Sequence, residues 1–221
     1  MSPRPAAAAV PSTPRPRSSL GGDIQALPVR PMASRSDWEA RHRTARAVVP
    51  DPDPFLGEAL EHVRQAAPAA ADAVDIACGR GHNSLALAAY GLKTVAVDYS
   101  SEALRLCAKL AAEKGLAVET RCYDLESTDA DWGDSRFDVV VVFRYLHRPL
   151  VPLLKRIVRP GGIIIYKTFT RKQLQFGTGP RKPDYLLEEK ELPELFADFR
   201  HLLYRETCDS EATAALVAQK P

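Results

Sequence analysis

From Ala73 to its end, the chain alternates short apolar runs with longer stretches of helical periodicity, and this alternation constrains the fold most strongly. The first five apolar runs read VDIAC, TVAVD, LAVETR, FDVVVVF and GIIIYKTF. Helices are expected at about 83–90, 101–114, 150–158 and 188–196, and two terminal strands at about 200–207 and 212–219. Strands that alternate with helices assemble into one sheet with helices on both faces. The pattern therefore predicts an α/β fold with a doubly wound, mostly parallel sheet.

The segment before this alternation divides into a tail and a helical region. Residues 1–34 are rich in Pro, Ala, Ser and Arg and offer too little apolar surface to offset the entropy of ordering. We expect a disordered tail there. The alternatives are an organelle transit peptide, which the prolines oppose, and translation from Met32. Cap helices are expected over about 37–66, so the folded domain should span 35–221.

Charge and cysteine usage exclude several classes of function. The 30 basic residues nearly balance the 28 acidic ones, so we expect neither a nucleic-acid surface nor a membrane surface. No apolar run reaches the roughly 18 residues of a membrane span. The four cysteines form no CxxC pair, and no His/Cys/Asp/Glu group has metal-ligand spacing, so no metal is expected. These features favour a cytoplasmic protein with reduced thiols, with organelle targeting through residues 1–34 as the alternative.

The most informative position is the carboxyl end of the first strand, because open parallel sheets bind ligands beyond these ends. Asp75 is followed by Gly79 and Gly81 and then by a helix, and glycine lets the backbone turn tightly and approach a ligand. Asp98 ends the next strand 23 residues after Asp75, about the interval that places a carboxylate beside a ribose diol. A plain strand-to-helix turn is the alternative reading. Ser84 in place of a third glycine disfavours a dinucleotide site.

This acidic-xxx-Gly-x-Gly pattern resembles the signature of class I S-adenosylmethionine-dependent methyltransferases, from about Trp38 to the end of the chain. Asp124 at the end of the third strand and the RPGG turn before the fifth agree with that family. The resemblance implies a Rossmann-like seven-stranded sheet that ends in an antiparallel hairpin. It also implies S-adenosyl-L-methionine as cofactor and S-adenosyl-L-homocysteine as product. The residues implied to bind the cofactor are Asp75, Ala77, Cys78, Gly79, Gly81, Asp98, Tyr99, Asp124, Leu125 and Phe143.

Within that set, the resemblance assigns Asp75 and the glycine turn to the methionine part, Asp98 to the ribose and Asp124 to the adenine. For Asp124, a surface turn aspartate is the alternative. No Asn/Asp-Pro-Pro-aromatic run or Pro-Cys pair follows the fourth strand, which argues against DNA methylation.

Residues that would contact the methyl acceptor follow the fourth and fifth strands. The YLHR segment and the loop over about 170–187 resemble the corresponding segment and lid of tellurite-resistance-like small-molecule methyltransferases. A loop of that length is usually functional. His147 is a candidate base near neutral pH, with helix capping as its alternative, and Arg144 is a candidate anion contact. The further acceptor and lid candidates, for which loop packing is the alternative among the aromatics, are Trp38, Tyr145, Arg148, Lys167, Gln173, Phe176 and Tyr185.

The sequence thus predicts a monomeric or weakly dimeric methyltransferase for a small soft or anionic acceptor: a thiol, a metalloid oxyanion or a small organic acid. A catalytically silent S-adenosylmethionine-binding regulatory module is one alternative. An RNA methyltransferase guided by the arginines of the tail is another, and its RNA affinity would fall steeply with ionic strength.

Overall fold

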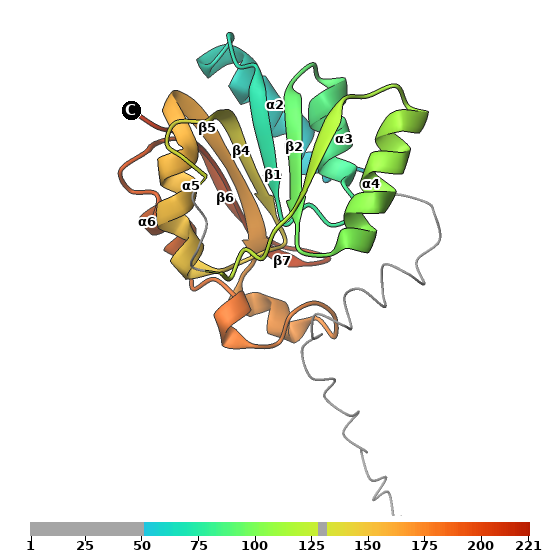
Figure 1. The fold of residues 1–221 in the computed structure, drawn as a ribbon. Coiled ribbons are helices and arrows are strands. Elements are labelled where there is room, and N and C mark those ends of the chain that lie inside the picture. The colour runs from blue at the N-terminus through green and yellow to red at the C-terminus, as the bar shows by residue number, and fades with distance from the viewer. Residues whose placement is uncertain (1–50, 128–131) are drawn as a thin grey trace, which may run out of the picture. The chain divides into compact units, whose positions relative to one another are not determined.

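The computed structural model describes residues 51–127 and 132–221. The expected tail over 1–34, the expected helix near 37–46 and Trp38 lie outside these residues. The described residues form a seven-stranded sheet in the order β3-β2-β1-β4-β5-β7-β6 (Figure 1). The predicted α/β class and doubly wound sheet are confirmed, because the strands wind outward from β1 in both directions.

Six neighbour pairings define the sheet. The first five strands are β1 (Asp72–Ile76), β2 (Lys93–Asp98), β3 (Val118–Cys122), β4 (Phe137–Phe143) and β5 (Val158–Phe169), and they run parallel. β7 (Ala212–Gln219) pairs antiparallel with both β5 and β6 (Arg200–Cys208). The predicted antiparallel end of the sheet is therefore confirmed, and β7 is the one strand of the described sheet that runs against the others.

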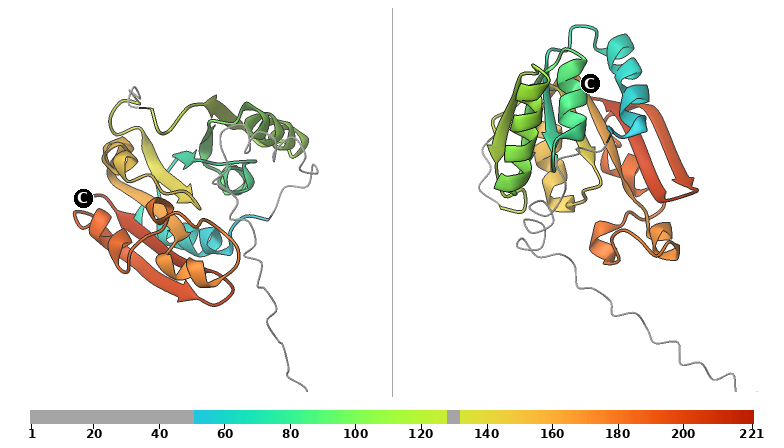
Figure 2. Two further views of the ribbon diagram at one scale, coloured as in Figure 1. Left: turned by 90° about the horizontal axis from the view of Figure 1, so that it is seen from below. Right: turned by 90° about the vertical axis from the view of Figure 1, so that its right-hand side faces the viewer.

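Helices cover both faces of this sheet (Figure 2). One face carries α2 (Pro54–Ala66), α3 (His82–Ala89) and α4 (Ser101–Glu113), and the other carries α5 (Val151–Ile157) and α6 (Glu191–Leu195). The apolar residues of α2 that recur at helical spacing are buried against β4, β5 and β7, as the sequence pattern predicted. In the described residues, none of the helices has the length and apolar character needed to cross a lipid bilayer.

Two element boundaries differ from the sequence-based expectation. The helix expected over about 188–196 is the shorter α6, because Lys190 adopts a left-handed conformation (φ 61°) and interrupts the backbone before it. The fifth strand begins at Val158 rather than after the RPGG turn. Val158 pairs with Phe137 and Ile163 pairs with Val139, so the residues between Val158 and Ile163 form a β-bulge. Gly161, within this bulge, has φ 76°.

The segment expected to be a long loop, about 170–187, contains two 3-10 helices, η2 (Arg171–Gln175) and η3 (Pro183–Tyr185). Its two ends are joined by a bridge between Thr170 and Leu187. The segment therefore starts and ends beside β5, with its two ends held together by this bridge.

Candidate functional site

The glycine turn after β1 has a geometry that side chains disfavour. Gly79 and Gly81 both have positive φ, 55° and 80°, and so does Ala77 at 56°. A Cβ added at Gly81 would lie 2.1 Å from Cys107 Sγ on α4. Glycine is therefore required at position 81 by two independent constraints, the backbone conformation and the close approach of α4. The turn leads directly into α3, which begins at His82.

The Asp98 carboxylate fastens this turn to the next strand. Its Oδ2 accepts a hydrogen bond from the backbone N–H of Gly79 at 2.8 Å, and its Oδ1 accepts one from the N–H of Ser100 at 2.9 Å. The side chain is buried. A carboxylate has about four lone-pair sites, so these two bonds fix its orientation and leave acceptor capacity for hydroxyl groups.

Asp75 lies near the end of β1, just before the glycine turn. It is 1% exposed, and its Oδ2 accepts a hydrogen bond from Ser84 Oγ on α3 at 2.6 Å. The pKa of Asp75 is raised to about 7, because burial raises it most, the bond from Ser84 opposes the rise, and the nearby Asp98 adds to it. Asp75 therefore ties α3 to β1 from beneath the turn. Ser84, which stands where a dinucleotide-binding turn has its third glycine, supplies the partner.

Asp124 lies at the same edge of the sheet as Asp98. The N–H of Tyr123 donates to the Asp98 backbone oxygen at 2.9 Å, which places the residues after β2 and β3 side by side. Asp124 is exposed, and its Oδ1 accepts a hydrogen bond from the Glu126 N–H at 3.1 Å, which closes an Asx turn. Leu125 is buried in the core.

Three other residues of the implied cofactor set have distinct surroundings. Cys78 is buried in a small cluster with Ala96, Leu104 and Cys107, and burial raises the pKa of its thiol. Phe143 is buried against α2, with its ring 6.4 Å from that of Phe55. Tyr99 is partly buried, and its backbone oxygen accepts from the Cys122 thiol. Phe143 therefore contributes to the core in the part of the chain that the structure describes.

A cluster of charges, which we call the carboxyl-end cluster, lies beyond β4 and β5. Lys167 Nζ lies 3.0 Å from both carboxylate oxygens of Asp53 and 3.6 Å from Glu211. Arg144 lies 2.9 Å from Glu211, and its guanidinium carbon is 5.3 Å from the centre of the Phe169 ring. Arg144 has a strained backbone, with φ 56°. The cluster joins the start of α2, the end of β5 and the β6–β7 turn.

Sequence reasoning missed Asp53, Glu211 and His82. Asp53 caps α2 and pairs with Lys167. His82 is partly buried beside the carboxyl-end cluster, and burial and Arg144 lower its pKa, while Asp53 opposes the decrease. The sequence signal that could have identified His82 was its position directly after the glycine turn. Asp53 and Glu211 lie far from the motifs in sequence, so no local pattern marked them.

Arg148 and Gln173 are engaged in contacts within the chain. Arg148 pairs with Glu191 on α6 and donates to the backbone oxygens of Asp184 and Leu186 at 2.9 and 3.0 Å. Gln173 is 1% exposed, and its Oε1 accepts from the N–H of Ala212 at 2.7 Å. Both side chains therefore fasten the 170–187 segment to the sheet and α6, which the sequence did not predict.

The remaining predicted acceptor residues surround that segment. Tyr145 has a buried hydroxyl with no hydrogen-bond partner among the described residues, and burial raises its pKa. His147 is partly buried and precedes η1 (Arg148–Leu150), where its side chain makes no capping bond. Tyr185 and Phe176 are partly buried. Over 51–127 and 132–221, no group of three or more His, Cys, Asp and Glu side chains is placed to hold a metal ion.

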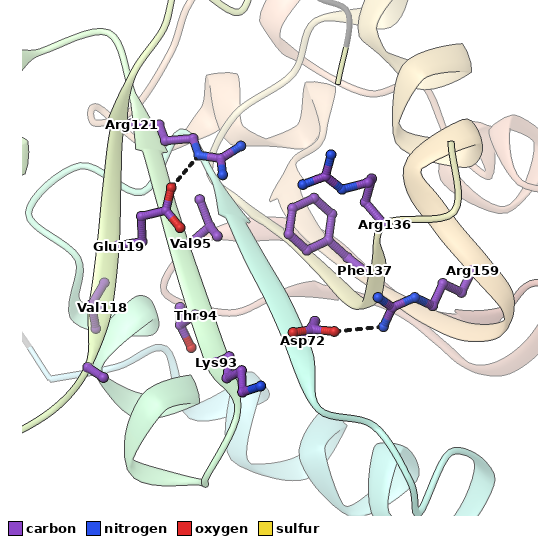
Figure 3. A pocket seen from close by; sticks show the side chains of 11 residues that line it. Asp72, Lys93, Thr94, Val95, Val118, Glu119, Arg121, Arg136, Phe137 and Arg159 are labelled. Carbon is purple, nitrogen blue, oxygen red and sulfur yellow. Dashed lines mark hydrogen bonds and ion pairs between the residues drawn. The ribbon is translucent and has the colours of Figure 1, made fainter. Parts of the chain in front are cut away.

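A groove of about 560 Å³ lies at the opposite end of the sheet, at the amino ends of β1 to β4 (Figure 3). Its charged side chains largely pair with one another: Arg159 lies 2.8 Å from Asp72, and Arg121 lies 2.7 Å from Glu119. None of the residues predicted to bind cofactor or acceptor lines it. The candidate site is therefore at the carboxyl ends, where the glycine turn, Asp98 and the carboxyl-end cluster come together.

Comparison with known sequences agrees with this location. A family model described as a methyltransferase domain matches residues 73–162. The chain is 30% identical over 148 residues to the ubiquinone biosynthesis O-methyltransferase of Azotobacter vinelandii. The matched region covers 65% of this chain and 61% of that enzyme. The chain spans 42% to 61% of the length of the first three curated relatives it matches.

Solved structures share the fold. TehB from Haemophilus influenzae superposes with a TM-score of 0.61 at 19% identity, over 75% of this chain and 62% of TehB. The magnesium protoporphyrin IX methyltransferase of Synechocystis, a structure with bound S-adenosylhomocysteine, gives a TM-score of 0.61 at 15% identity, over 86% and 95% of the two chains. Residues 73–162, which contain the glycine turn and Asp98, thus match a methyltransferase domain, and the described sheet shares its fold with these solved methyltransferase-like structures.

Proposed function

We propose that this chain transfers the methyl group of S-adenosylmethionine to a small anionic acceptor. The observation that carries the proposal is the geometry of the glycine turn. Gly79 and Gly81 have positive φ, and the N–H of Gly79 donates a hydrogen bond that orients the Asp98 carboxylate. The turn lies at the carboxyl end of β1, where open parallel sheets bind their ligands. S-adenosylmethionine supplies an electrophilic methyl group on a positively charged sulfur.

The side chains at the turn fit such a cofactor. The absence of a Cβ at Gly79 lets the backbone approach the methionine part, and its absence at Gly81 lets the turn pack against α4. The remaining acceptor capacity of Asp98 suits two ribose hydroxyls. Asp124, exposed at the same edge, is available to the adenine amino group through its second carboxylate oxygen. Asp75 acts on the cofactor indirectly, by holding α3 and the turn in place through Ser84.

The carboxyl-end cluster supports an acceptor that carries negative charge. Arg144 and Lys167 are the cations of this cluster and pair with Glu211 and Asp53. A guanidinium that exchanges Glu211 for the acceptor can bind a carboxylate or oxyanion through two parallel hydrogen bonds. The O-methyltransferase names of the relatives add an oxygen nucleophile to the candidates. We therefore favour a small organic acid with a hydroxyl group, with a thiol and a metalloid oxyanion as the other acceptor classes.

The test is a measurement of S-adenosylhomocysteine release with 3,4-dihydroxybenzoate, 2-mercaptoethanol, selenite and tellurite as acceptors. We expect turnover with at least one anionic acceptor and a large decrease in kcat/KM for Arg144→Gln. Lys109→Gln, which removes an exposed cation from α4, is the matched control and should leave the rate unchanged. If the protein binds S-adenosylhomocysteine but shows no turnover with any acceptor, the result favours the regulatory-module alternative.

A further inference from the structure

His82 has surroundings that the roles assigned so far do not use. It is the first residue of α3, directly after Gly81, and its side chain is partly buried. β1 and β4 are neighbours with Ile76 opposite Val142, so the residues that follow these two strands meet at one edge of the sheet. Arg144 follows β4 there. The Asp53 N–H donates to Oδ1 of Asn83, the neighbour of His82, at 3.0 Å, and Asp53 pairs with Lys167, so His82 lies beside the carboxyl-end cluster that contains Arg144.

We propose that His82 is the proton acceptor of the methyl-transfer step, taking the proton of an acceptor hydroxyl held beside Arg144. This inference rests on the proposed methyltransferase function and names a catalytic residue for it. A base is needed because a hydroxyl is a weak nucleophile while it keeps its proton.

The carboxylates around the turn are already engaged. Asp53 pairs with Lys167, and Glu211 pairs with Arg144. Asp98 accepts from two backbone N–H groups, and Asp75 accepts from Ser84. Among the described residues, no hydrogen bond engages the His82 ring. His82 is thus a titratable group at this edge that is open to a proton from the acceptor.

The charges that face His82 favour its neutral form. Burial lowers the pKa of His82, and Arg144 and then Arg80 lower it as well, whereas Asp53 acts in the opposite direction. A neutral imidazole can accept a proton at pH 7. The same Arg144 charge stabilises the acceptor oxygen as its negative charge develops, so base and anion contact act together.

The acceptor O–H bond breaks and its proton passes to a ring nitrogen of His82. The oxygen lone pair forms the O–CH₃ bond while the electron pair of the S–CH₃ bond moves to sulfur and neutralises it. The imidazolium then releases the proton to solvent, and the products are the methyl ether and S-adenosylhomocysteine.

The first test needs no acceptor and uses NMR titration of the full-length protein, with the His82 signal assigned by its loss in His82→Gln. We expect the pKa of His82 to lie below 6.5 in the free protein and in the S-adenosylhomocysteine complex, and His82→Gln to keep its affinity for this ligand. A pKa of His82 that rises above 6.5 on binding, together with a tenfold loss of affinity in His82→Gln, would show that His82 binds the carboxylate of the cofactor. This result would overturn the proposal.

The second test uses turnover. With 3,4-dihydroxybenzoate, we expect His82→Gln to lower kcat about 10² to 10⁴-fold at pH 7, and the loss to shrink as the pH rises and the acceptor ionises by itself. His62→Gln, which replaces a partly buried histidine on α2, is the matched control and should change kcat less than threefold. Equal rates for wild type and His82→Gln would refute the role of His82 and leave the methyltransferase function standing, whereas failure of the wild type to bind S-adenosylhomocysteine would refute the function itself.

Discussion

Replacing Gly81 by alanine should destabilise the fold and weaken cofactor binding for reasons that can be separated experimentally. The added Cβ would lie 2.1 Å from Cys107 Sγ and 2.9 Å from its Cβ, so α4 must move away from the turn. Overpacking of this kind costs about 1–3 kcal/mol. The backbone at φ 80° adds about 1–2 kcal/mol for a residue with a side chain. We therefore expect the free energy of unfolding to fall by about 2–5 kcal/mol.

Two other glycines provide matched controls for Gly81→Ala. Gly91 has φ 103° but no atom within 4 Å of an added Cβ, so Gly91→Ala should show only the backbone cost. Gly57 lies within α2 with the same open space and an ordinary φ, so Gly57→Ala should stabilise the helix by about 0.5–1 kcal/mol. Cys107→Ala in the Gly81→Ala background removes the nearest clash and should restore part of the loss.

The assay is urea unfolding followed by circular dichroism, with S-adenosylhomocysteine affinity measured by calorimetry. Gly81→Ala should bind this ligand at least tenfold more weakly, while Gly91→Ala should bind it as the wild type does. If Gly81→Ala and Gly91→Ala lose the same stability, or if removal of the Cys107 thiol rescues nothing, the contact between the turn and α4 does not constrain position 81.

Two further predictions concern groups that hold the site in place. Because the folded pKa of Asp75 is raised to about 7, its contribution to stability should be fully present below pH 4 and should be lost as the pH rises toward 8. Asp75→Asn should flatten this loss in urea unfolding curves measured at a series of pH values, and an unchanged pH dependence would contradict the burial argument. Arg148→Met removes the pair with Glu191 and the bonds to the 170–187 segment, so limited proteolysis should cut that segment faster than in the wild type while the core remains intact. Uniform resistance in both proteins would show that Arg148 does not fasten the segment.

The sheet was predictable because its signals are local in sequence. Each buried strand of the central sheet reads as an apolar run, and the glycine turn and Asp98 stand at the ends of two such runs. The helix expected over about 188–196 was too long, because apolar spacing does not reveal a left-handed residue such as Lys190. The pattern therefore fixed the type of each element better than its ends.

The parts of the site that could not be predicted depend on contacts between distant residues. Asp53 and Lys167 are 114 positions apart, and Arg144 and Glu211 are 67 positions apart. Nothing in the neighbourhood of either carboxylate indicates its partner. Long charged side chains also have several partners within reach, so the sequence does not reveal that Arg148 pairs with Glu191.

The most direct test of the account is the thermal stabilisation of the full-length protein by S-adenosylhomocysteine compared with NADH, in wild type and in Asp98→Ala. At 100 times its dissociation constant, a ligand that binds only the folded state adds about 2.7 kcal/mol of stability. We expect S-adenosylhomocysteine to stabilise the wild type to this extent, NADH to have no effect, and Asp98→Ala to lose most of the response. Stabilisation by NADH alone, or an undiminished response in Asp98→Ala, would contradict the assignment of the glycine turn and Asp98 to S-adenosylmethionine.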